Sequence, residues 1–325
     1  MSRGKLSVEC ALREQLQRGG RYLLAVSGGV DSIALLHGCA MLQRLLKAHF
    51  EVAHVDHGLR TESVKDAMFV EKQAKLLGFE FHLKRASPPK RGNLEAWGRN
   101  LRYTFFSEIC ARCELQQVLT AHNANDVAET LLMRLVSNKE MRSIARIDQR
   151  RRCLRPLLLV PRAEIELFVR HHKLRFRVDK SNFDEDFLRN RVRHKLLPLL
   201  SKQFDSRIVE VLSIRAQHLA QDTEAMDEVC SRAVLPIGDL EFGTKLWRRA
   251  LVKVLAELPE ALRWRVAEVL FLPKLGFRIG RLHAHALVDF IVGERSALEI
   301  PGGITLCSKG GAVVVTGAFL GEQLR

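Results

Sequence analysis

The sequence predicts an α/β fold: a parallel sheet flanked by helices, followed by a helical linker and a smaller α+β domain. Short apolar runs alternate with longer amphipathic stretches between residues 21 and 136, which is typical of strands and helices that alternate in a parallel sheet. Residues 204–233 form one long helical pattern, and the end of the chain has short apolar runs around glycine pairs. At 325 residues, the chain is long enough for two domains.

Four strands are expected in the first part of the chain, each a short run rich in apolar residues. They lie at residues 22–26, 50–55, 79–83 and 117–121. The stretches after them carry apolar residues at helical spacing. They predict helices at 32–47, 62–77, 94–113 and 124–136. Because ligands bind beyond the carboxyl ends of the strands in such sheets, we expect the functional site at that edge.

The chain changes character after these elements. Residues 142–156 are basic and irregular, and a further helix is expected with Pro161 near its first turn. These changes predict three parts. They are a first domain of residues 1–203, a helical linker of residues 204–233 and a C-terminal domain of residues 234–325.

Positive charge is concentrated in the first domain. Residues 1–203 hold 37 basic and 22 acidic side chains, whereas residues 204–325 hold 15 of each, so the whole net charge of +15 lies in the first part. Clustered cations of this kind indicate a polyphosphate partner, most simply a nucleic acid. A well-hydrated basic surface without such a partner is the alternative that composition leaves open.

Seven cysteines are scattered along the chain, which argues against a disulfide framework. Only Cys110 and Cys113, in the string CARC, have the spacing of a metal or redox pair. They fall in an amphipathic helical stretch without a second cysteine or histidine pair nearby. We therefore interpret them as buried helix thiols rather than as zinc ligands.

The sequence contains no apolar run near the roughly 18 residues that span a bilayer. Its first residues, MSRGKLSVECALREQL, also lack the apolar core of a secretory signal. We therefore expect a cytoplasmic protein with no membrane partner. The oligomeric state stays open, with a homodimer among the options.

The string SGGVDS, residues 27–32, stands between the first strand and the first long helix of the predicted sheet. Two glycines let the backbone approach a ligand, and the helix start favours an anion such as phosphate. The lysine of the usual nucleotide loop is absent. Asp31 would therefore need Mg²⁺ between its carboxylate and the phosphate. The alternative is a tight turn in which Asp31 only favours the start of the helix.

This string resembles the signature of the ATP pyrophosphatases, the PP-loop superfamily with an adenine nucleotide alpha hydrolase-like fold. Further motifs resemble the tRNA(Ile)-lysidine synthetase family more narrowly. They are HVDHGLR (54–60), GNLEAWGRNLRY (92–103), AHNANDVAETLLMRL (121–135), RPLLLVPRAEI (155–165), VDKSNFDEDFLRNRVRHKLLPLL (178–200) and, more weakly, IPGG (300–303). Residues 1–203 would then be the catalytic domain, and residues 234–325 would contact tRNA.

The resemblance implies a ligase that modifies tRNA. Members of that family use ATP and Mg²⁺ to adenylate the wobble cytidine of tRNA(Ile) with a CAU anticodon. The amine of free L-lysine then displaces AMP and forms lysidine. The implied partners are therefore the anticodon stem-loop of tRNA(Ile) and free lysine.

The resemblance also assigns roles to residues of this chain. For ATP it implies Ser27, Gly28, Gly29, Val30, Asp31, Ser32 and His54, and for Mg²⁺ it implies Asp31 through a phosphate. For catalysis it implies Asp31, Arg102, His122 and Asp126. For lysine it implies Arg102, Asp126 and Glu129, and for tRNA it implies Arg189, Asn190 and Arg193. The residue-level alternatives are a surface helix charge at Glu129, an ordinary turn at 54–57 and solvated charges at 189–193.

Two segments depart from the family pattern. Asn123 and Asn125 stand where the family usually has a second histidine and the first of two adjacent aspartates, so we expect no two-carboxylate metal site. The stretch VSNKEMRSIARI, residues 136–147, replaces a glycine-rich segment. His122 and Asp126 keep the family residues, and we therefore expect the activity to be kept.

Two rival functions remain. The first is a tRNA cytidine 2-thiolation enzyme of the same superfamily, in which a Cys-x-x-Cys pair precedes the arginine-bearing segment. Here CARC follows Arg102 by eight residues, which disfavours that function. The second is a non-catalytic RNA-binding protein that retains the fold.

Overall fold

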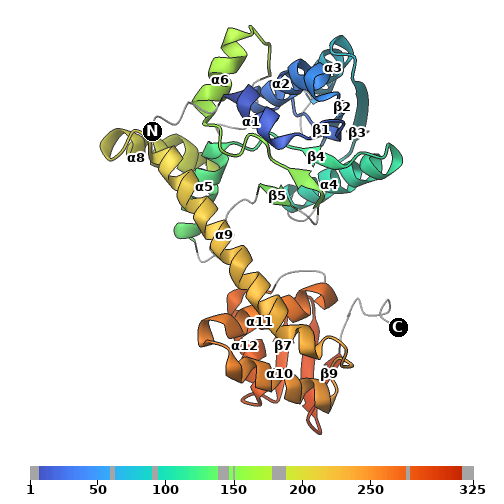
Figure 1. Cartoon of the computed structure of the whole chain (residues 1–325), viewed down its shortest axis with the longest axis vertical. Coiled ribbons are helices and arrows are strands. Elements are labelled where there is room, and N and C mark those ends of the chain that lie inside the picture. The colour runs from blue at the N-terminus through green and yellow to red at the C-terminus, as the bar shows by residue number, and fades with distance from the viewer. Residues whose placement is uncertain are drawn as a thin grey trace. The chain divides into compact units, whose positions relative to one another are not determined.

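The computed structural model describes residues 7–58, 63–89, 94–137, 146–148, 151–177, 188–275 and 279–316. Contacts divide it into two compact units, Met1–Gln217 and His218–Arg325 (Figure 1). Helix α9, Ile208–Val234, contains the point of division. The three-part division into residues 1–203, 204–233 and 234–325 stays a prediction. Within the described residues, no helix combines the length and the apolar character that crossing a membrane requires.

The first unit is built on a six-stranded sheet in the described part of the chain, with the order β3-β2-β1-β4-β6-β5. All neighbouring strands are parallel except β5, which is antiparallel to β6. The strands are β1 Arg21–Ala25, β2 His49–Asp56, β3 Glu80–Arg85, β4 Gln117–Leu119, β5 Ile147–Asp148 and β6 Cys153–Leu154. The predicted parallel sheet is therefore confirmed.

Helices cover both faces of this sheet because its strands are apolar on both sides. One face carries α1, α2, α3 and α6, whose apolar side chains pack on Leu24, Phe50 and Val52. The other face carries α4, whose Phe105 and Ile109 pack on neighbouring side chains of the sheet. The bounds are α1 Val8–Gln15, α2 Val30–Leu46, α3 Ser63–Leu76, α4 Leu94–Arg112, α5 Ala124–Leu135 and α6 Arg162–His171.

A helical segment after residue 187 packs on α5 and brings polar side chains to the same edge of the sheet. It consists of α7 Leu188–Arg191, the π-helical turn η3 Val192–Leu196 and α8 Leu197–Gln203. Val192 and Leu197 share a small apolar core with Ala128 and Leu132 of α5. π-helical turns occur frequently at functional sites.

The second unit combines helices with a three-stranded antiparallel sheet, which confirms the smaller α+β part. In the described residues its elements are η4 Leu235–Ile237, α10 Lys245–Glu257, α11 Glu260–Leu275, α12 Arg281–Val292, β7 Ala297–Ile300, β8 Ile304–Lys309 and β9 Ala312–Thr316. Its separate core contains Trp247, Phe271 and Phe290. The unit therefore has an apolar interior of its own.

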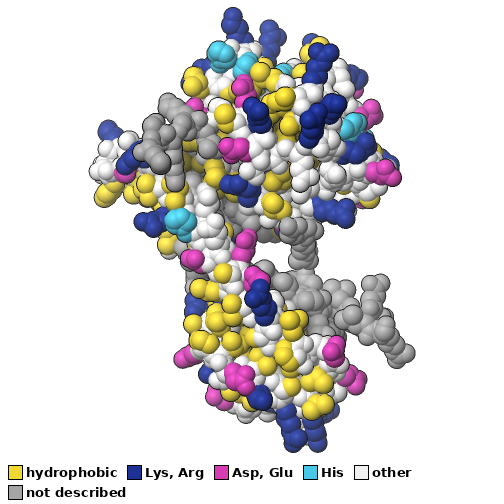
Figure 2. All heavy atoms as spheres, in the orientation of Figure 1, with side chains coloured by type: hydrophobic (Ala, Val, Ile, Leu, Met, Phe, Trp, Pro, Cys, Tyr) yellow, Lys and Arg dark blue, Asp and Glu magenta, His cyan; other side chains and the backbone are white. Residues whose placement is uncertain are grey.

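The predicted elements agree with the structure apart from their ends. The fourth strand ends at Leu119 rather than at residue 121, because the chain there leaves the sheet to begin α5. The short strands β5 and β6 and the helix α1 were not predicted. Figure 2 shows Lys and Arg side chains spread over the visible face of the first unit.

Candidate functional site

A pocket of about 750 Å³ lies where β1, β2 and β4 end. Side chains from α4 and from the segment α7–η3 complete its walls. Most of the predicted site residues line it. They are Ser27, Gly29, Asp31, Ser32, His54, Arg102, His122, Asp126, Arg189, Asn190 and Arg193. Gly28, Val30 and Glu129 are not among the lining residues. Gly28 and Val30 are next to lining residues in the sequence, and Glu129 is hydrogen-bonded to the lining residues Arg189 and Arg193.

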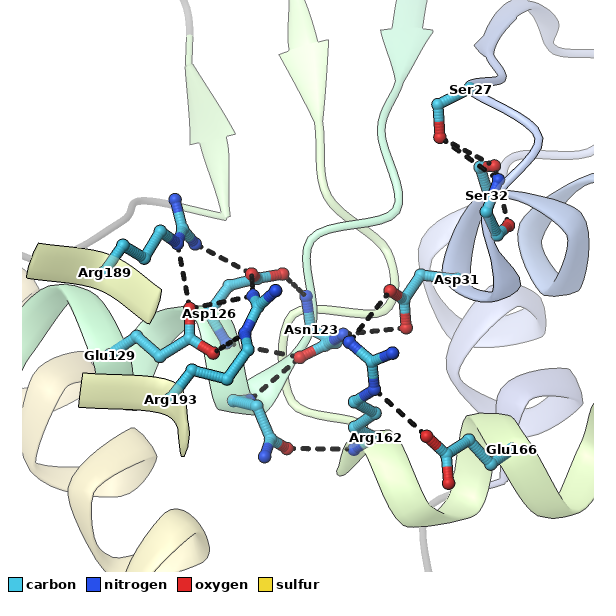
Figure 3. Close-up of polar contacts among 12 residues, drawn as sticks. Ser27, Asp31, Ser32, Asn123, Asp126, Glu129, Arg162, Glu166, Arg189 and Arg193 are labelled. Carbon is cyan, nitrogen blue, oxygen red and sulfur yellow. Dashed lines mark hydrogen bonds and ion pairs between the residues drawn. The ribbon is translucent and has the colours of Figure 1, made fainter. Parts of the chain in front are cut away.

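The turn 27–32 is held by its own serine hydroxyl groups. Ser32 Oγ donates to the carbonyl oxygen of Gly29 at 2.9 Å and accepts from the backbone N–H of Gly28 at 3.1 Å. Ser27 Oγ lies 3.2 Å from Ser32 Oγ (Figure 3). Gly28 has a φ of 93°, a left-handed backbone in which any larger residue would be strained. The turn is therefore preformed, and the first turn of α2 follows it directly.

Asp31 lies in the first turn of α2 and points towards α5 and α6 (Figure 3). Its Oδ1 accepts a hydrogen bond from Asn123 Nδ2 at 2.9 Å, and its Oδ2 lies 3.8 Å from Arg162 Nη1. Burial raises the pKa of Asp31 to about 6, although the charge of Arg162 opposes this effect. The ionised carboxylate is therefore poorly hydrated and would gain from a further cation.

Asn123 joins two parts of the site. It is the N-cap of α5, where its side-chain oxygen accepts from the backbone N–H groups of Asn125 and Asp126. The Asp126 carboxylate in turn accepts a hydrogen bond from the backbone N–H of Asn123, which completes a capping box. Because the same Asn123 side chain donates to Asp31, the starts of α2 and α5 are held together.

Two arginines neutralise the acidic pair of α5 (Figure 3). Arg189 donates to Asp126 Oδ1 and to Glu129 Oε2, both at 2.8 Å. Arg193 donates to Glu129 Oε1 at 2.6 Å and Oε2 at 2.9 Å, and reaches Asp126 Oδ1 at 3.3 Å. The Glu129 side chain is only 1% exposed. The alternative of a surface helix charge at Glu129 is therefore wrong, because the carboxylate is buried and paired.

His54 and His122, two of the three histidines among the described lining residues of the pocket, are held neutral at physiological pH. His54 Nδ1 donates to the carbonyl oxygen of Val26 at 2.8 Å, which leaves its Nε2 as an acceptor. Burial lowers the pKa of His54, and burial also lowers that of His122 to about 4. His122 Nδ1 is hydrogen-bonded to Thr120 Oγ1 at 2.9 Å. The two rings therefore offer polar contacts without charge.

Comparison with known proteins shows the family of this chain. A sequence model of the PP-loop domain matches residues 6–200. The chain belongs to the PP-loop family. The turn 27–32 is accordingly called the PP-loop below.

Curated relatives of this PP-loop chain are tRNA(Ile)-lysidine synthases. One from Thermosipho africanus is 39% identical over 193 residues, which cover 58% of this chain and 45% of that protein. One from Symbiobacterium thermophilum is 36% identical over 238 residues, which cover 70% of this chain and 49% of that protein. The chain thus matches about half the length of these relatives.

The same fold is found among solved structures. A U34-tRNA thiolase from Methanococcus maripaludis superimposes with a TM-score of 0.53 at 14% identity. The match covers 65% of this chain and 78% of that chain. At this level of identity, the likeness concerns the fold alone.

Sequence reasoning missed Arg162 as a member of the PP-loop site. Its guanidinium faces Asp31 and also bonds Glu166 at 3.1 Å, and its backbone N–H donates to Asn125. One signal could have found it: Arg162 is a basic residue in the first turn of α6, where the helix dipole disfavours a positive charge. Such a residue indicates a partner elsewhere in the structure.

Other predictions concern residues that surround the PP-loop. Arg102, which the resemblance implied, and Arg99, one helical turn before it, both line the pocket, and Arg99 lies over the ring of Tyr103. Residues 138–145 of the departing segment and 178–187 of the last motif lie outside the described residues. The expected RNA contacts of Arg189 and Arg193 stay a prediction, since both side chains bind acidic residues here.

Proposed function

We propose that this chain is a ligase that joins lysine to carbon 2 of the wobble cytidine in tRNA(Ile) with a CAU anticodon. ATP would first adenylate the cytidine at its 2-oxo group, with release of pyrophosphate. The lysine side-chain amine would then displace AMP and leave lysidine. The names of the curated relatives support this function. The PP-loop beside a polar pocket at the strand ends is the observation that carries it.

In this proposal the PP-loop holds the phosphates of ATP. The preformed turn with Gly28 and the start of α2 together favour an anion. Asp31 fits one Mg²⁺, because its buried carboxylate has a raised pKa and gains from a cation. Asp126 is already neutralised by arginines, so the residues fit a site with one carboxylate. When bound, Mg²⁺ would stabilise the negative charge that develops on the leaving pyrophosphate.

The cytidine and the adenosine would lie between the PP-loop and α4. We assign His54 to the adenosine and His122 to the activated base, where neutral rings can bind without adding charge. Arg102 reaches the same pocket and would bind phosphate or the lysine carboxylate. Each of these groups orients a substrate, which lowers the entropic cost of the reaction.

The lysine ammonium would bind to the acidic pair of α5. Asp126 and Glu129 supply two carboxylates, and both form ion pairs with Arg189 and Arg193 before the substrate arrives. Lysine must lose a proton before its amine attacks. We assign Asp126, which lines the pocket, as the acceptor of this proton. As tRNA phosphates draw the two arginines away, the carboxylates would become available to lysine.

The partners in this proposal are free L-lysine and the anticodon stem-loop of tRNA(Ile). The charge excess of the first 203 residues supports an RNA partner. The second unit would contact the body of the tRNA. We place the protein in the cytoplasm, because the proposed substrates are found there.

The rival thiolation reaction has less support. Thiolation needs cysteines at the site, and none of the lining residues in the described part of the chain is a cysteine. Cys110 of α4 is instead buried in the apolar core between this helix and the sheet.

A test of the proposal measures AMP release from ATP with purified full-length protein, Mg²⁺ and a tRNA(Ile) transcript that carries C34. We expect AMP formation that requires this transcript and falls at least 100-fold in Asp31→Ala. Glu71→Ala, which removes an exposed carboxylate of α3 outside the pocket, is the matched control. AMP release that is absent with every transcript would favour the non-catalytic RNA-binding alternative.

A further inference from the structure

A second polar cluster lies at the other end of the sheet from the pocket, where β2 begins and α4 has ended. It contains Glu51 of β2, His82 of β3 and Cys113, the residue after α4. The donor atoms of these three side chains all lie within 4.8 Å of one another. Glu51 is buried, and its pairing with histidines and a thiol is a feature that the proposed reaction does not use.

The sheet brings these residues together in a defined way. His49 and Glu51 are two apart on β2, so their side chains share one face. The parallel register pairs Ala53 with His82, which puts His82 on that same face. Helix α4 packs on this face, and Cys113, the residue after α4, lies in the cluster. Residues from three distant parts of the sequence therefore converge.

We propose that Glu51, His82 and Cys113, together with His49, form a binding site for a structural Zn²⁺ ion. Carboxylate, imidazole and thiolate are the side-chain ligands that zinc takes in proteins, and four of them complete a tetrahedral site. One carboxylate and one thiolate balance the charge of the ion, while both imidazoles bind as neutral rings.

Three of the four donors, those of Glu51, His82 and Cys113, already lie close together, and His49 joins them through its contact with Glu51. Glu51 Oε1 lies 2.9 Å from His49 Nε2, and Glu51 Oε2 lies 2.6 Å from His82 Nε2. In a tetrahedral zinc site with bonds of about 2.0 to 2.3 Å, donor atoms are roughly 3.3 to 3.8 Å apart. Each histidine nitrogen would therefore separate from its carboxylate oxygen by about 1 Å or less, and the His49 ring would also turn towards His82 and Cys113.

The hydrogen bonds indicate which protons would move when zinc binds. Zinc takes the place of the protons that now lie between the histidine Nε2 atoms and Glu51, and each ring proton moves to Nδ1. Arg112 Nη2 now donates to His82 Nδ1 at 3.3 Å. The exposed Arg112 side chain must turn to water when that nitrogen becomes protonated. The thiol of Cys113 loses its proton to solvent, so binding releases one proton.

The two cysteines of CARC have different surroundings. Cys110 is buried in the apolar core under α4, and burial raises the pKa of its thiol to about 11. Cys113 is half-buried, packs at the edge of that core and hydrogen-bonds Glu51. The interpretation as buried helix thiols therefore holds for Cys110 alone, and Cys113 is the one available to a metal.

A first experiment measures alkylation of individual cysteines by mass spectrometry, with chelator-treated full-length wild-type protein. One equivalent of Zn²⁺ is expected to slow the alkylation of Cys113 at least tenfold. Cys10 and Cys307 are internal controls, and their alkylation rates should not change. An unchanged rate at Cys113 would overturn the proposal and leave the cluster as a hydrogen-bonded pairing of a buried glutamate.

A second experiment adds Co²⁺ in place of Zn²⁺ and follows the thiolate-to-cobalt charge-transfer band. The wild-type protein should develop this band at one equivalent, and Cys113→Ser and His82→Gln should lose it. Cys307→Ser is the matched control and should keep it. Thermal unfolding without metal checks that each variant is folded. A folded Cys113→Ser protein that keeps the band, or a wild-type protein that lacks it, would contradict the site.

Discussion

Asn123 Nδ2 donates a hydrogen bond to Asp31 Oδ1 at 2.9 Å, across 92 residues of sequence. The same asparagine caps α5 with its side-chain oxygen. One amide group therefore uses its donor for the PP-loop aspartate and its acceptor for the helix that carries the acidic pair. An aspartate at this position could keep the cap, but it would place a second negative charge against Asp31.

Two substitutions separate these roles. Asn123→Ala loses the cap and should lower the free energy of unfolding by about 1 kcal/mol. Asn123→Asp should keep the cap but place a second carboxylate against Asp31, and it should reduce AMP formation at least tenfold because the donor to Asp31 is gone. Chemical denaturation and AMP release measure the two effects. Ser7→Ala, which removes the N-cap of α1 away from the pocket, should cost similar stability with AMP formation intact. Equal activity of Asn123→Asp and wild type would contradict the role of the amide.

The raised pKa of Asp31 makes a prediction about stability and pH. Burial raises the pKa from 3.8 to about 6, so ionisation costs the folded state up to about 3 kcal/mol. This cost is absent below about pH 4 and complete above about pH 6. Asp31→Asn should therefore stabilise the protein at neutral pH and lose that advantage near pH 4.

Asp148 is the matched control, because its pKa is shifted in the opposite direction from that of Asp31. Burial alone would raise its pKa, but the hydrogen bonds from Arg151 outweigh this effect and lower it. Asp148→Asn should destabilise the protein at neutral pH, and the loss should shrink as the pH falls. Thermal unfolding across the pH range measures both variants. Parallel curves for wild type and Asp31→Asn would mean that Asp31 ionises normally.

Glu129 should be the most sensitive carboxylate of the site to substitution. Glu129→Gln removes the buried negative charge that Arg189 and Arg193 share, which should lower the free energy of unfolding by about 2 to 4 kcal/mol. Glu71 forms an exposed pair with Lys75, so Glu71→Gln should cost less than about 1 kcal/mol. Urea unfolding compares the two. If the two variants lose the same stability, the buried ion-pair cluster does not contribute as proposed.

The binding of tRNA should weaken steeply with salt. Basic side chains of the first 203 residues would displace counterions, and each phosphate contact contributes about −0.7 to −0.9 to the slope of log K against log salt. About five contacts would give a slope near −4. Filter binding at several KCl concentrations measures it. A slope shallower than −1 would contradict binding of the tRNA through several phosphate contacts.

The strands and helices around the PP-loop could be predicted because burial imposes their periodicity. The strands β1 and β2 start and end within one or two residues of the predicted ranges. The site could be placed at the strand ends for a topological reason, since parallel strands bring their carboxyl ends together. The two-residue strands β5 and β6 are too short to carry any period.

The partners of the site residues could not be predicted from the sequence. Arg193 and Glu129 are 64 residues apart, and only the packing of η3 on α5 brings them together. The resemblance implied Arg193 as a cation for RNA and Glu129 as an anion for lysine, with no sign that they bind each other. A side chain's chemistry could be read locally, but its neighbour is decided by the tertiary fold.

The most direct test of the account is incorporation of radiolabelled lysine into a tRNA(Ile) transcript by the full-length protein with ATP and Mg²⁺. We expect label that resists mild alkaline deacylation, requires cytidine at position 34 and is lost in Asp31→Ala. AMP release with this transcript but no stable lysine label would contradict it, because adenylation would then serve a different nucleophile.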